Sequence, residues 1–410
     1  MLHDHSALIA QFRELLTQQR YNAVVVHNYC RSAGYFLHYL AQREIGVEAA
    51  TPAEVSNYLR CAVRRFRQRH GYSPPAEWQS IPRAGIHALL RLVQKRWPPE
   101  PPPASRGDVL CRAVCSEYRE WLRVHRGLAA ATVDALMWEG QHFLSWYTER
   151  TSVMGFMELS IRDIDAYFEM RAPGLRRKSL KDVAERLRSL MRFLHRTGRA
   201  AVDLAPQIIA PMLYAYETIP SALSSDQISA VLKVTREDRS PMGLRDYAIL
   251  LLLSTYGMRS GEIRRLRLED IDWRAEFLRI RHSKTGAHSL LPLMAPVGEA
   301  LLNYLRRGRP KTDAREVFIR TRAPYRPLSM FYSEVRRRLA AAGVKPRGKC
   351  GPHAFRHARA VSLLRASVPR KVIGDLLGHR SEEATLPYLK LATEDLRAIA
   401  LEIPGQEARS

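Results

Sequence analysis

Charged, imidazole and phenol side chains in the C-terminal half of the chain are of the types needed to attack a phosphodiester. Such an attack builds negative charge on the non-bridging oxygens, and guanidinium groups stabilise that charge because they stay protonated. Arg259 and Arg356 fit this role. His353 and His379 titrate near neutral pH and could hold the phosphate or accept a proton. The residue types therefore predict strand cleavage at phosphorus.

Two further side chains complete this chemistry. Lys284 lies in a short turn, from which its ammonium group could give a proton to the 5′ leaving oxygen. Tyr388 supplies a phenolic oxygen that could store the bond energy as phosphotyrosine, so religation would need neither ATP nor a metal ion. Glu262, one turn after Arg259, is expected to buttress its guanidinium group. Taken singly, an ion pair, a helix cap or a core tyrosine would explain each of them as well.

The local sequence predicts how the first of these residues are positioned. Residues 244–255 are expected to form an apolar helix, which ends in the segment 256–262 where a second helix begins. Residues 277–281 and 289–293 have the pattern of two strands joined as a hairpin. Lys284-Thr-Gly286 forms its turn, so we expect Lys284 at a loop tip.

The remaining residues are expected on a run of helices. Pro352 opens a helix that carries His353 and Arg356. Residues 372–377 form a second helix closed by Gly378, and Ser381 caps a short one that leads to Tyr388.

The order of these motifs resembles that of the tyrosine recombinases. The matching residues are Arg259 within Gly-Met-Arg-Ser-Gly-Glu, Lys284 in a hairpin turn, His353-Ala-Phe-Arg356, Leu377-Gly-His379, and Tyr388 nine positions later. The match covers about residues 222–402, and residues 108–200 are similar to the core-binding domain of that family. A chance match of all six residues in order is remote. The ending Leu-Gly-His, followed by Tyr-Leu-Lys-Leu-Ala, looks most like recombinases of transposons or integrative elements.

The resemblance implies a site-specific DNA recombinase or integrase that cleaves and rejoins strands through a 3′-phosphotyrosine intermediate, without a cofactor. Its catalytic residues would be Arg259, Lys284, His353, Arg356, His379 and the nucleophile Tyr388, supported by Glu262. Double-stranded DNA would be its partner. Exchange of two duplexes needs four cuts and one tyrosine makes one cut, so we expect a homotetramer on synapsed DNA. Accessory recombinases or DNA-bending proteins are further candidate partners.

Two other functions use similar residues. A type IB topoisomerase has related Arg, Lys, His and Tyr chemistry, but a relaxing enzyme would not need two additional helical units with separate basic patches. An architectural DNA-binding protein with a decayed site is the second alternative. It is disfavoured because no expected catalytic position carries a different residue.

Composition agrees with a DNA-binding protein. The 410 residues carry a formal net charge of +24, which attracts polyanions. The longest apolar stretch, residues 248–253, is far shorter than the roughly 20 residues that cross a bilayer. The first five residues lack the pattern of a signal peptide, so we expect a cytoplasmic, nucleoid-associated protein without membrane contact. Five cysteines without CxxC spacing predict neither a disulfide framework nor a metal site.

Proline- and glycine-containing breaks between helical and strand patterns predict a multidomain, mainly α chain. It has helical N-terminal units and an α+β catalytic domain that contains a small antiparallel sheet. The Pro-rich linker 98–107 separates an N-terminal domain, 1–97, from a core-binding domain, 108–200. A second linker, 201–221, precedes the catalytic domain, 222–402, and a tail, 403–410. Ser224 is expected to open the first catalytic helix with a capping box.

The first two helical units share a sequence pattern that suggests a duplication. Residues 36–40, Phe-Leu-His-Tyr-Leu, match residues 143–147, Phe-Leu-Ser-Trp-Tyr. In each unit a capped helix follows, after Thr51 in the first and after Ser160 in the second. Residues 1–97 are therefore a possible duplicate of the core-binding domain.

Basic residues late in each unit are candidates for DNA contacts. In residues 180–194, leucines and a valine repeat at steps of three and four and predict a buried stripe. The basic residues that could lie on phosphates are Arg176, Arg177, Lys178, Lys181, Arg188, Arg192 and Arg196 in the second unit, and Arg64, Arg65 and Arg67 in the first. The alternative is that these residues form a solvated face.

Overall fold

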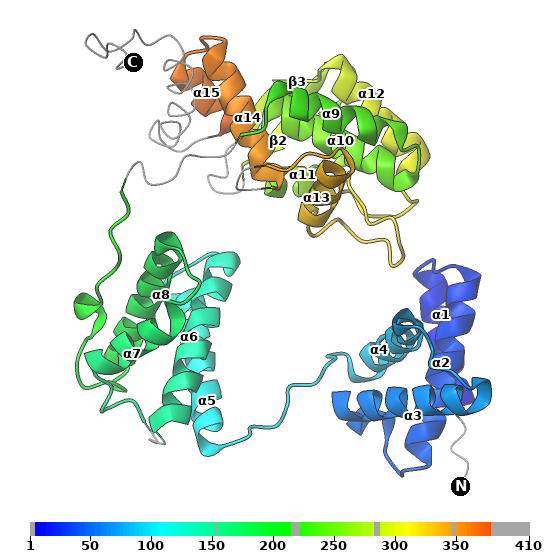
Figure 1. Ribbon diagram of the computed structural model, residues 1–410, viewed down its shortest axis with the longest axis vertical. Helices are drawn as coiled ribbons and strands as arrows, with labels where there is room; N and C mark the ends of the chain where they lie inside the picture. The colour runs from blue at the N-terminus through cyan, green and yellow to red at the C-terminus, as the bar shows by residue number, and fades with distance from the viewer. Residues whose placement is uncertain (1–4, 152–154, 215–221, 283–287, 347–349, 379–410) are drawn as a thin grey trace, which may run out of the picture. The chain divides into compact units, whose positions relative to one another are not determined.

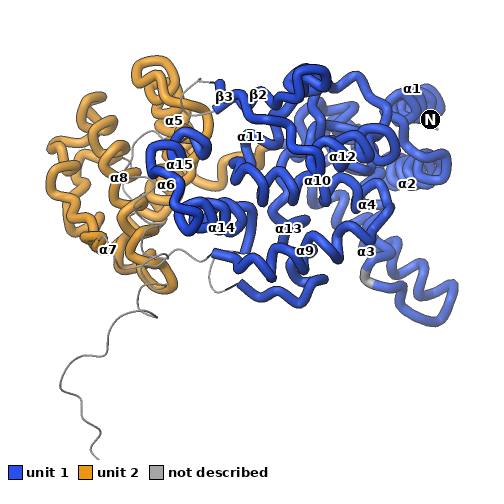
Figure 2. Tube along the Cα trace, turned by 90° about the horizontal axis from the view of Figure 1, so that it is seen from above, with its two compact units in different colours: residues 1–99, 219–410 blue, residues 100–218 orange. Residues whose placement is uncertain are grey.

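The computed structural model describes residues 5–151, 155–214, 222–282, 288–346 and 350–378 (Figure 1). Contacts divide the chain into two compact units: residues 100–218, and residues 1–99 together with 219–410 (Figure 2). The described residues are mostly helical and include one small antiparallel sheet. The predicted mainly α fold, with an α+β part near the C-terminus, is thus confirmed. The five expected boundaries between domains and linkers stay a prediction.

Residues 5–99 form four α-helices: α1 Ser6–Gln18, α2 Ala23–Ala41, α3 Pro52–His70 and α4 Ser80–Gln94. The predicted start of α3 is confirmed, since the backbone N–H of Thr51 donates to Glu54 Oε2 at 2.8 Å in a capping box. Gly71 ends α3 with φ of +76°, a left-handed conformation that suits glycine. Helices α2 and α4 pack together around buried residues such as Phe36, Leu37, Ile86, Leu89 and Leu90.

The described residues of the unit 100–218 also form four α-helices: α5 Arg106–Glu120, α6 Ala130–Thr151, α7 Ile161–Arg171 and α8 Arg177–Arg196. A capping box between Ser160 and Asp163 opens α7, as predicted. The predicted stripe of α8 is buried at Val183, Leu187, Leu190 and Leu194, whereas Leu180 is half-buried. This stripe packs against α6.

The first and second sets of helices contain the same aromatic cluster. In the first, the Tyr58 ring meets Phe36 and Tyr39 edge-on, with both centroid distances 5.4 Å. In the second, the Tyr167 ring meets Phe143 at 5.1 Å and Trp146 at 5.3 Å, also edge-on. The guanidinium groups of Arg43 and Arg150 lie over Tyr39 and Trp146, respectively. The sequence match pairs Phe36 and Tyr39 with Phe143 and Trp146, and Tyr58 and Tyr167 each lie seven residues after the paired caps Thr51 and Ser160. The packing therefore supports the predicted duplication.

The C-terminal part is built around one central helix, α10 Pro241–Tyr256. Its residues 248–253 are all buried, as expected for a helix that is apolar on every side. The helices around it are α9 Ser225–Glu237, α11 Ser260–Arg265, α12 Ala295–Asn303, α13 Tyr332–Ala341, α14 Pro352–Arg365 and α15 Arg370–Leu377. The predicted capping box at Ser224 opens α9. The predicted helices at 244–255 and 372–377 correspond to α10 and α15.

A three-stranded antiparallel sheet lies beside these helices, in the order β1 Ile271–Asp272, β2 Phe277–Arg281 and β3 His288–Pro292. Strands β2 and β3 pair with Leu278 opposite Leu291, and both side chains are buried. The predicted hairpin is confirmed, with β3 beginning one residue earlier than expected. Short 3-10 or π turns complete the fold at residues 47–49, 76–79, 121–125, 205–207, 268–270 and 304–308.

A buried charge cluster ties α10 to α13. The Asp246 carboxylate accepts hydrogen bonds from Arg245 Nε at 3.1 Å and from Arg338 Nε at 2.9 Å, and Arg337 donates at 3.1 Å. Asp246, Arg245 and Arg338 are all buried. A carboxylate with several guanidinium partners offsets the cost of burying the charges, so the cluster fixes how α13 packs on the central helix.

None of the described helices is both long and apolar enough to cross a membrane.

Candidate active site

Arg259 lies in the sharp turn between α10 and α11. Gly257 ends α10 with φ of +65°, and a Cβ at this position would lie 2.7 Å from Leu377 Cδ2. The backbone N–H of Arg259 donates to Glu262 Oε2 at 2.7 Å, and its guanidinium group donates to Glu262 Oε1 at 2.9 Å. The predicted buttress is therefore present. The Arg259 guanidinium also donates to the carbonyl oxygen of Gly378 at 2.7 Å.

Glu262 joins Arg259 to His282. His282 Nδ1 lies 2.9 Å from Glu262 Oε1, and His282 Nε2 lies 2.7 Å from the hydroxyl of Ser289 on β3. Both Glu262 and His282 are buried. Burial would raise the pKa of Glu262, but hydrogen bonds from His282 and Arg259 hold that pKa below its ordinary value. The carboxylate is therefore ionised at neutral pH, and its stabilising effect is lost only as the pH falls through this lowered pKa.

Arg356 is a buried residue of α14, with 4% of its surface exposed. Its guanidinium group donates to the carbonyl oxygens of Gly257 at 2.8 Å and Leu377 at 2.5 Å. The last carbonyls of a helix lack partners within the helix, so Arg356 supplies donors to the C-terminal ends of both α10 and α15. Arg259 and Arg356 thus bond consecutive carbonyls, those of Gly378 and Leu377, and meet at one turn of the chain.

His353 stands one turn before Arg356 on α14 and is exposed. The His357 ring is half-buried, with its centroid 6.4 Å from that of His353. His282, which is not among the catalytic residues that the motifs predict, bonds directly to Glu262 and belongs to the site.

Three of the predicted catalytic residues, Lys284, His379 and Tyr388, lie outside the described residues. Residues close to Lys284 and His379 in the chain do take part in the contacts around Arg259 and Arg356. His282, the residue directly after β2, precedes Lys284 by two positions. Gly378, the left-handed end of α15 with φ of +61°, directly precedes His379. The structure therefore brings Arg259, Glu262 and Arg356 next to His282 and Gly378. The chain continues from these two residues to Lys284 and His379.

The predicted DNA-binding residues of α8 are not equivalent. Arg176, Arg177, Lys178, Arg192 and Arg196 are exposed, and Lys181 is half-buried. Lys178 forms an ion pair with Asp182. Arg188 is half-buried and donates to the carbonyl oxygen of Ile208 at 2.7 Å and to Glu185 at 2.8 Å, so it anchors the segment after α8. Arg192 and Arg196 are the better candidates for phosphate contacts.

The basic residues of α3 lie on its exposed face. Arg64, Arg65 and Arg67 are all exposed. Arg67 donates to the hydroxyl of Ser73 at 2.7 Å, next to the turn that ends the helix. Arg64 and Arg65 have no such local contact in the described residues.

Comparison with known proteins places these residues in a family. Residues 221–395 match the model of the phage integrase family. The putative integrase/recombinase y4gC of Sinorhizobium fredii is 70% identical over 46% of this chain and 98% of its own length. The putative integrase/recombinase y4rA of the same organism is 31% identical over 97% of this chain and 94% of its own.

A solved structure has the same fold. A lambda integrase tetramer bound to a Holliday junction matches 83% of this chain and 91% of its own, with a TM-score of 0.52 and 17% sequence identity. The resemblance inferred from Arg259, His353-Ala-Phe-Arg356 and Tyr388 is thus matched by sequence relatives over nearly the whole chain. The chain belongs to the phage integrase family of tyrosine recombinases.

Proposed function

We propose that the protein is a site-specific DNA recombinase that cleaves and rejoins strands through a 3′-phosphotyrosine on Tyr388. The observation that carries this proposal is the meeting of Arg259 and Arg356 at the Leu377–Gly378 turn, from which the chain continues to His379 and Tyr388. A phosphodiester held near this turn would have guanidinium groups beside the oxygens that gain charge.

The proposed reaction conserves the energy of the broken bond. The Tyr388 oxygen attacks phosphorus and loses its proton to a base, for which a histidine is suited. The P–O5′ bond breaks, and the leaving 5′ oxygen takes a proton from Lys284. The reverse attack by a 5′ hydroxyl of another strand restores a phosphodiester and frees Tyr388. Because one phosphoester bond replaces another, the cycle requires neither ATP nor a metal ion.

A nicked DNA substrate tests the proposal. When the nick lies next to the cleavage point, the short 5′ fragment diffuses away after attack and religation is blocked. We expect a protein–DNA adduct that survives denaturation, with the DNA attached to the peptide containing Tyr388. An adduct on any other residue would contradict the mechanism. Relaxation of supercoiled DNA without recombination sites would instead identify a topoisomerase.

Replacing Lys284 with alanine should slow cleavage of ordinary DNA strongly and cleavage of DNA with a 5′-thio leaving group little. A thiolate leaves without receiving a proton, so it does not need a general acid. A loss of about 10²-fold is the expected scale for one acid. Single-turnover cleavage rates on the two substrates measure the difference. Equal slowing of both would remove Lys284 from this role.

Double-stranded DNA and three further copies of the chain are the proposed partners. The +24 net charge and the exposed Arg192 and Arg196 support the contact with DNA. The lambda integrase relative of this fold is a tetramer on a Holliday junction. Light scattering of the protein with paired sites should give the mass of four copies, whereas a largest complex of two copies would contradict the proposal.

The element that the enzyme mobilises is inferred from the sequence around Tyr388. The ending Leu-Gly-His and Tyr-Leu-Lys-Leu-Ala is similar to recombinases of transposons and integrative elements. We therefore propose DNA at the boundary of such an element as the substrate, with inverted or direct repeats flanking the coding gene as the observation that would test it.

A further inference from the structure

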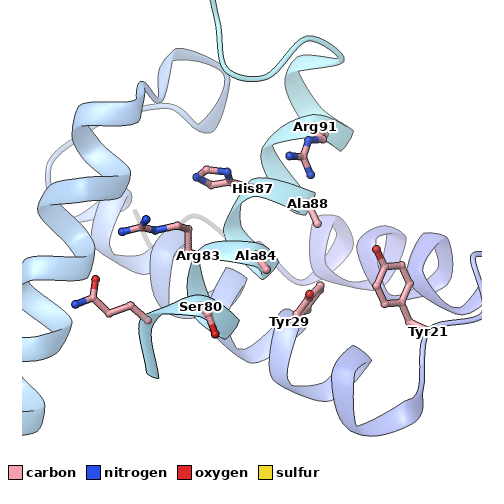
Figure 3. Close-up of a pocket in the computed structure, with 9 residues that line it drawn as sticks. Tyr21, Tyr29, Ser80, Arg83, Ala84, His87, Ala88 and Arg91 are labelled. Carbon is pink, nitrogen blue, oxygen red and sulfur yellow. The ribbon is translucent and has the colours of Figure 1, made fainter. Parts of the chain in front are cut away.

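A groove in the N-terminal part of the chain lies between α4 and the start of α2 (Figure 3). It has a volume of about 580 Å³. The polar residues that line it are Tyr21, Tyr29, Gln79, Ser80, Arg83, His87 and Arg91. Ala84 and Ala88 also line it, and their small side chains leave the space between α4 and the tyrosines open.

The fold fixes this arrangement. Residues 80, 83, 84, 87, 88 and 91 recur at steps of three and four and so share one face of α4, while Ile86, Leu89 and Leu90 are buried on the other. Gly85 permits a close approach of α4 to α2, because a Cβ there would lie 2.9 Å from the Tyr29 Cα. The groove is therefore a product of core packing and is held in shape without a ligand.

The groove offers hydrogen-bond donors and positive charge. Each of its seven polar side chains can donate, and no carboxylate is among the lining residues. Arg83 and Arg91 are exposed, and neither forms an ion pair or side-chain hydrogen bond with any residue in the described ranges. Arginine, tyrosine, serine and glutamine are the side chains that contact phosphate oxygens in protein–DNA complexes, so this chemistry suits a phosphodiester and repels a cation.

The duplication gives independent support. The Phe36–Tyr39–Tyr58 cluster has its counterpart in the second set of helices, where α6 packs on α8 as α2 packs on α4. Helix α4 is therefore the counterpart of α8. Both helices carry exposed arginines, at positions 83 and 91 of α4 and at positions 192 and 196 of α8.

We propose that the groove between α2 and α4 binds the phosphate backbone of duplex DNA, as a contact separate from those of α8 and the catalytic site. The inference rests on the proposed function, which supplies the DNA. Arg83 and Arg91 provide the charge, and Tyr21, Tyr29 and Ser80 provide neutral donors. His87 packs against Trp97, with ring centroids 5.6 Å apart, and serves chiefly to shape the wall. Burial and the neighbouring Arg91 and Arg83 lower its pKa, so it is neutral at pH 7.

The salt dependence of DNA affinity tests the contact in the full chain. Each neutralised phosphate contributes about 0.9 to the slope of log affinity against log salt, so the double variant Arg83→Ala and Arg91→Ala should lower that slope by about 2 on a long duplex. The double variant Arg83→Lys and Arg91→Lys should keep it. The matched control is Arg13→Ala with Arg31→Ala, which removes the same charge from exposed positions of α1 and α2 outside the groove.

The outcomes separate this inference from the proposed function. An unchanged salt slope in the Arg83/Arg91 variant would overturn the groove contact, and so would an equal fall of the slope in the control variant. Adduct formation on nicked DNA by the same proteins reports the recombinase activity independently. Hydrogen exchange of residues 80–94 distinguishes the source of the phosphate. We expect protection by duplex DNA and none by inorganic phosphate at equal ionic strength. Protection by inorganic phosphate with an unchanged slope would assign the groove to a free phosphate and refute DNA binding there.

Discussion

Replacing Tyr388 with phenylalanine should reduce covalent attachment to nicked DNA to an undetectable level while leaving DNA affinity nearly unchanged. The substitution removes the hydroxyl group, whose oxygen is the atom of that side chain able to form the phosphoester. It changes no charge, and most of the affinity is expected to come from arginines that contact phosphates. Denaturing gels measure the adduct, and equilibrium binding at fixed salt measures the affinity.

The control for this variant is Tyr325→Phe, which makes the same chemical change at a half-buried tyrosine outside the candidate site. It should form adducts at the wild-type rate. A normal adduct yield from the Tyr388→Phe variant would contradict the assignment of Tyr388 as the nucleophile. A loss of both adduct and affinity would show that Tyr388 contributes to folding or DNA binding, and the nucleophile would then have to be sought by mapping the attached peptide.

The elements with strong local signals could be predicted from the sequence. The apolar run 248–253, too hydrophobic for a surface helix, is the centre of α10. Thr51, Ser160 and Ser224 each open a helix with a capping box, because a side chain three residues later returns a hydrogen bond to the cap. Pro352 and Gly378 mark the start of α14 and the end of α15 for equally local reasons.

The connections between distant segments could not be predicted in this way. The bonds of Arg356 to the carbonyls of Gly257 and Leu377 depend on how three helices meet, and a backbone acceptor leaves no mark on residue type. The role of His282 was missed because its partner Glu262 is 20 positions away, although a histidine directly after an alternating strand was a signal that could have been followed. The DNA contact of Arg188 stays a prediction, and its bonds to the Ile208 carbonyl and to Glu185 could not be foreseen from its charge.

Gly378 joins these distant segments, and its replacement by alanine should slow strand cleavage by about 10²-fold or more. With φ of +61°, Gly378 adopts a conformation that costs an alanine roughly 1–2 kcal/mol. In addition, the new Cβ would lie 2.5 Å from His282 Cε1 and 2.7 Å from Nδ1. The ring cannot easily yield, because both of its nitrogens are hydrogen-bonded. Displacement of about 1 Å in a catalytic group commonly costs this much in rate.

Gly343→Ala separates the clash from the backbone strain. Gly343 has φ of +68°, and a Cβ there would meet no atom within 4 Å. Both variants should therefore lose similar stability, because both place an alanine in the left-handed conformation. At a temperature where both are folded, only Gly378→Ala should cleave DNA more slowly than the wild type. Single-turnover adduct formation measures this rate. If the two variants cleaved DNA equally, contact between Gly378 and His282 would have no part in placing the catalytic groups.

A double-variant cycle shows whether the effect passes through His282. Removing the ring with His282→Ala relieves the clash, so the combination with Gly378→Ala should lose less activity than the product of the two single losses. The reason is geometric: His282 holds Glu262, Glu262 holds Arg259, and Arg259 bonds the Gly378 carbonyl. Gly378 in turn packs closely against the His282 ring, which closes a ring of four residues. A shift at any one of these residues moves the Arg259 guanidinium group and Gly378, from which the chain leads to His379 and Tyr388. His282 and Gly378, far apart in sequence, should therefore behave in catalysis as a single unit.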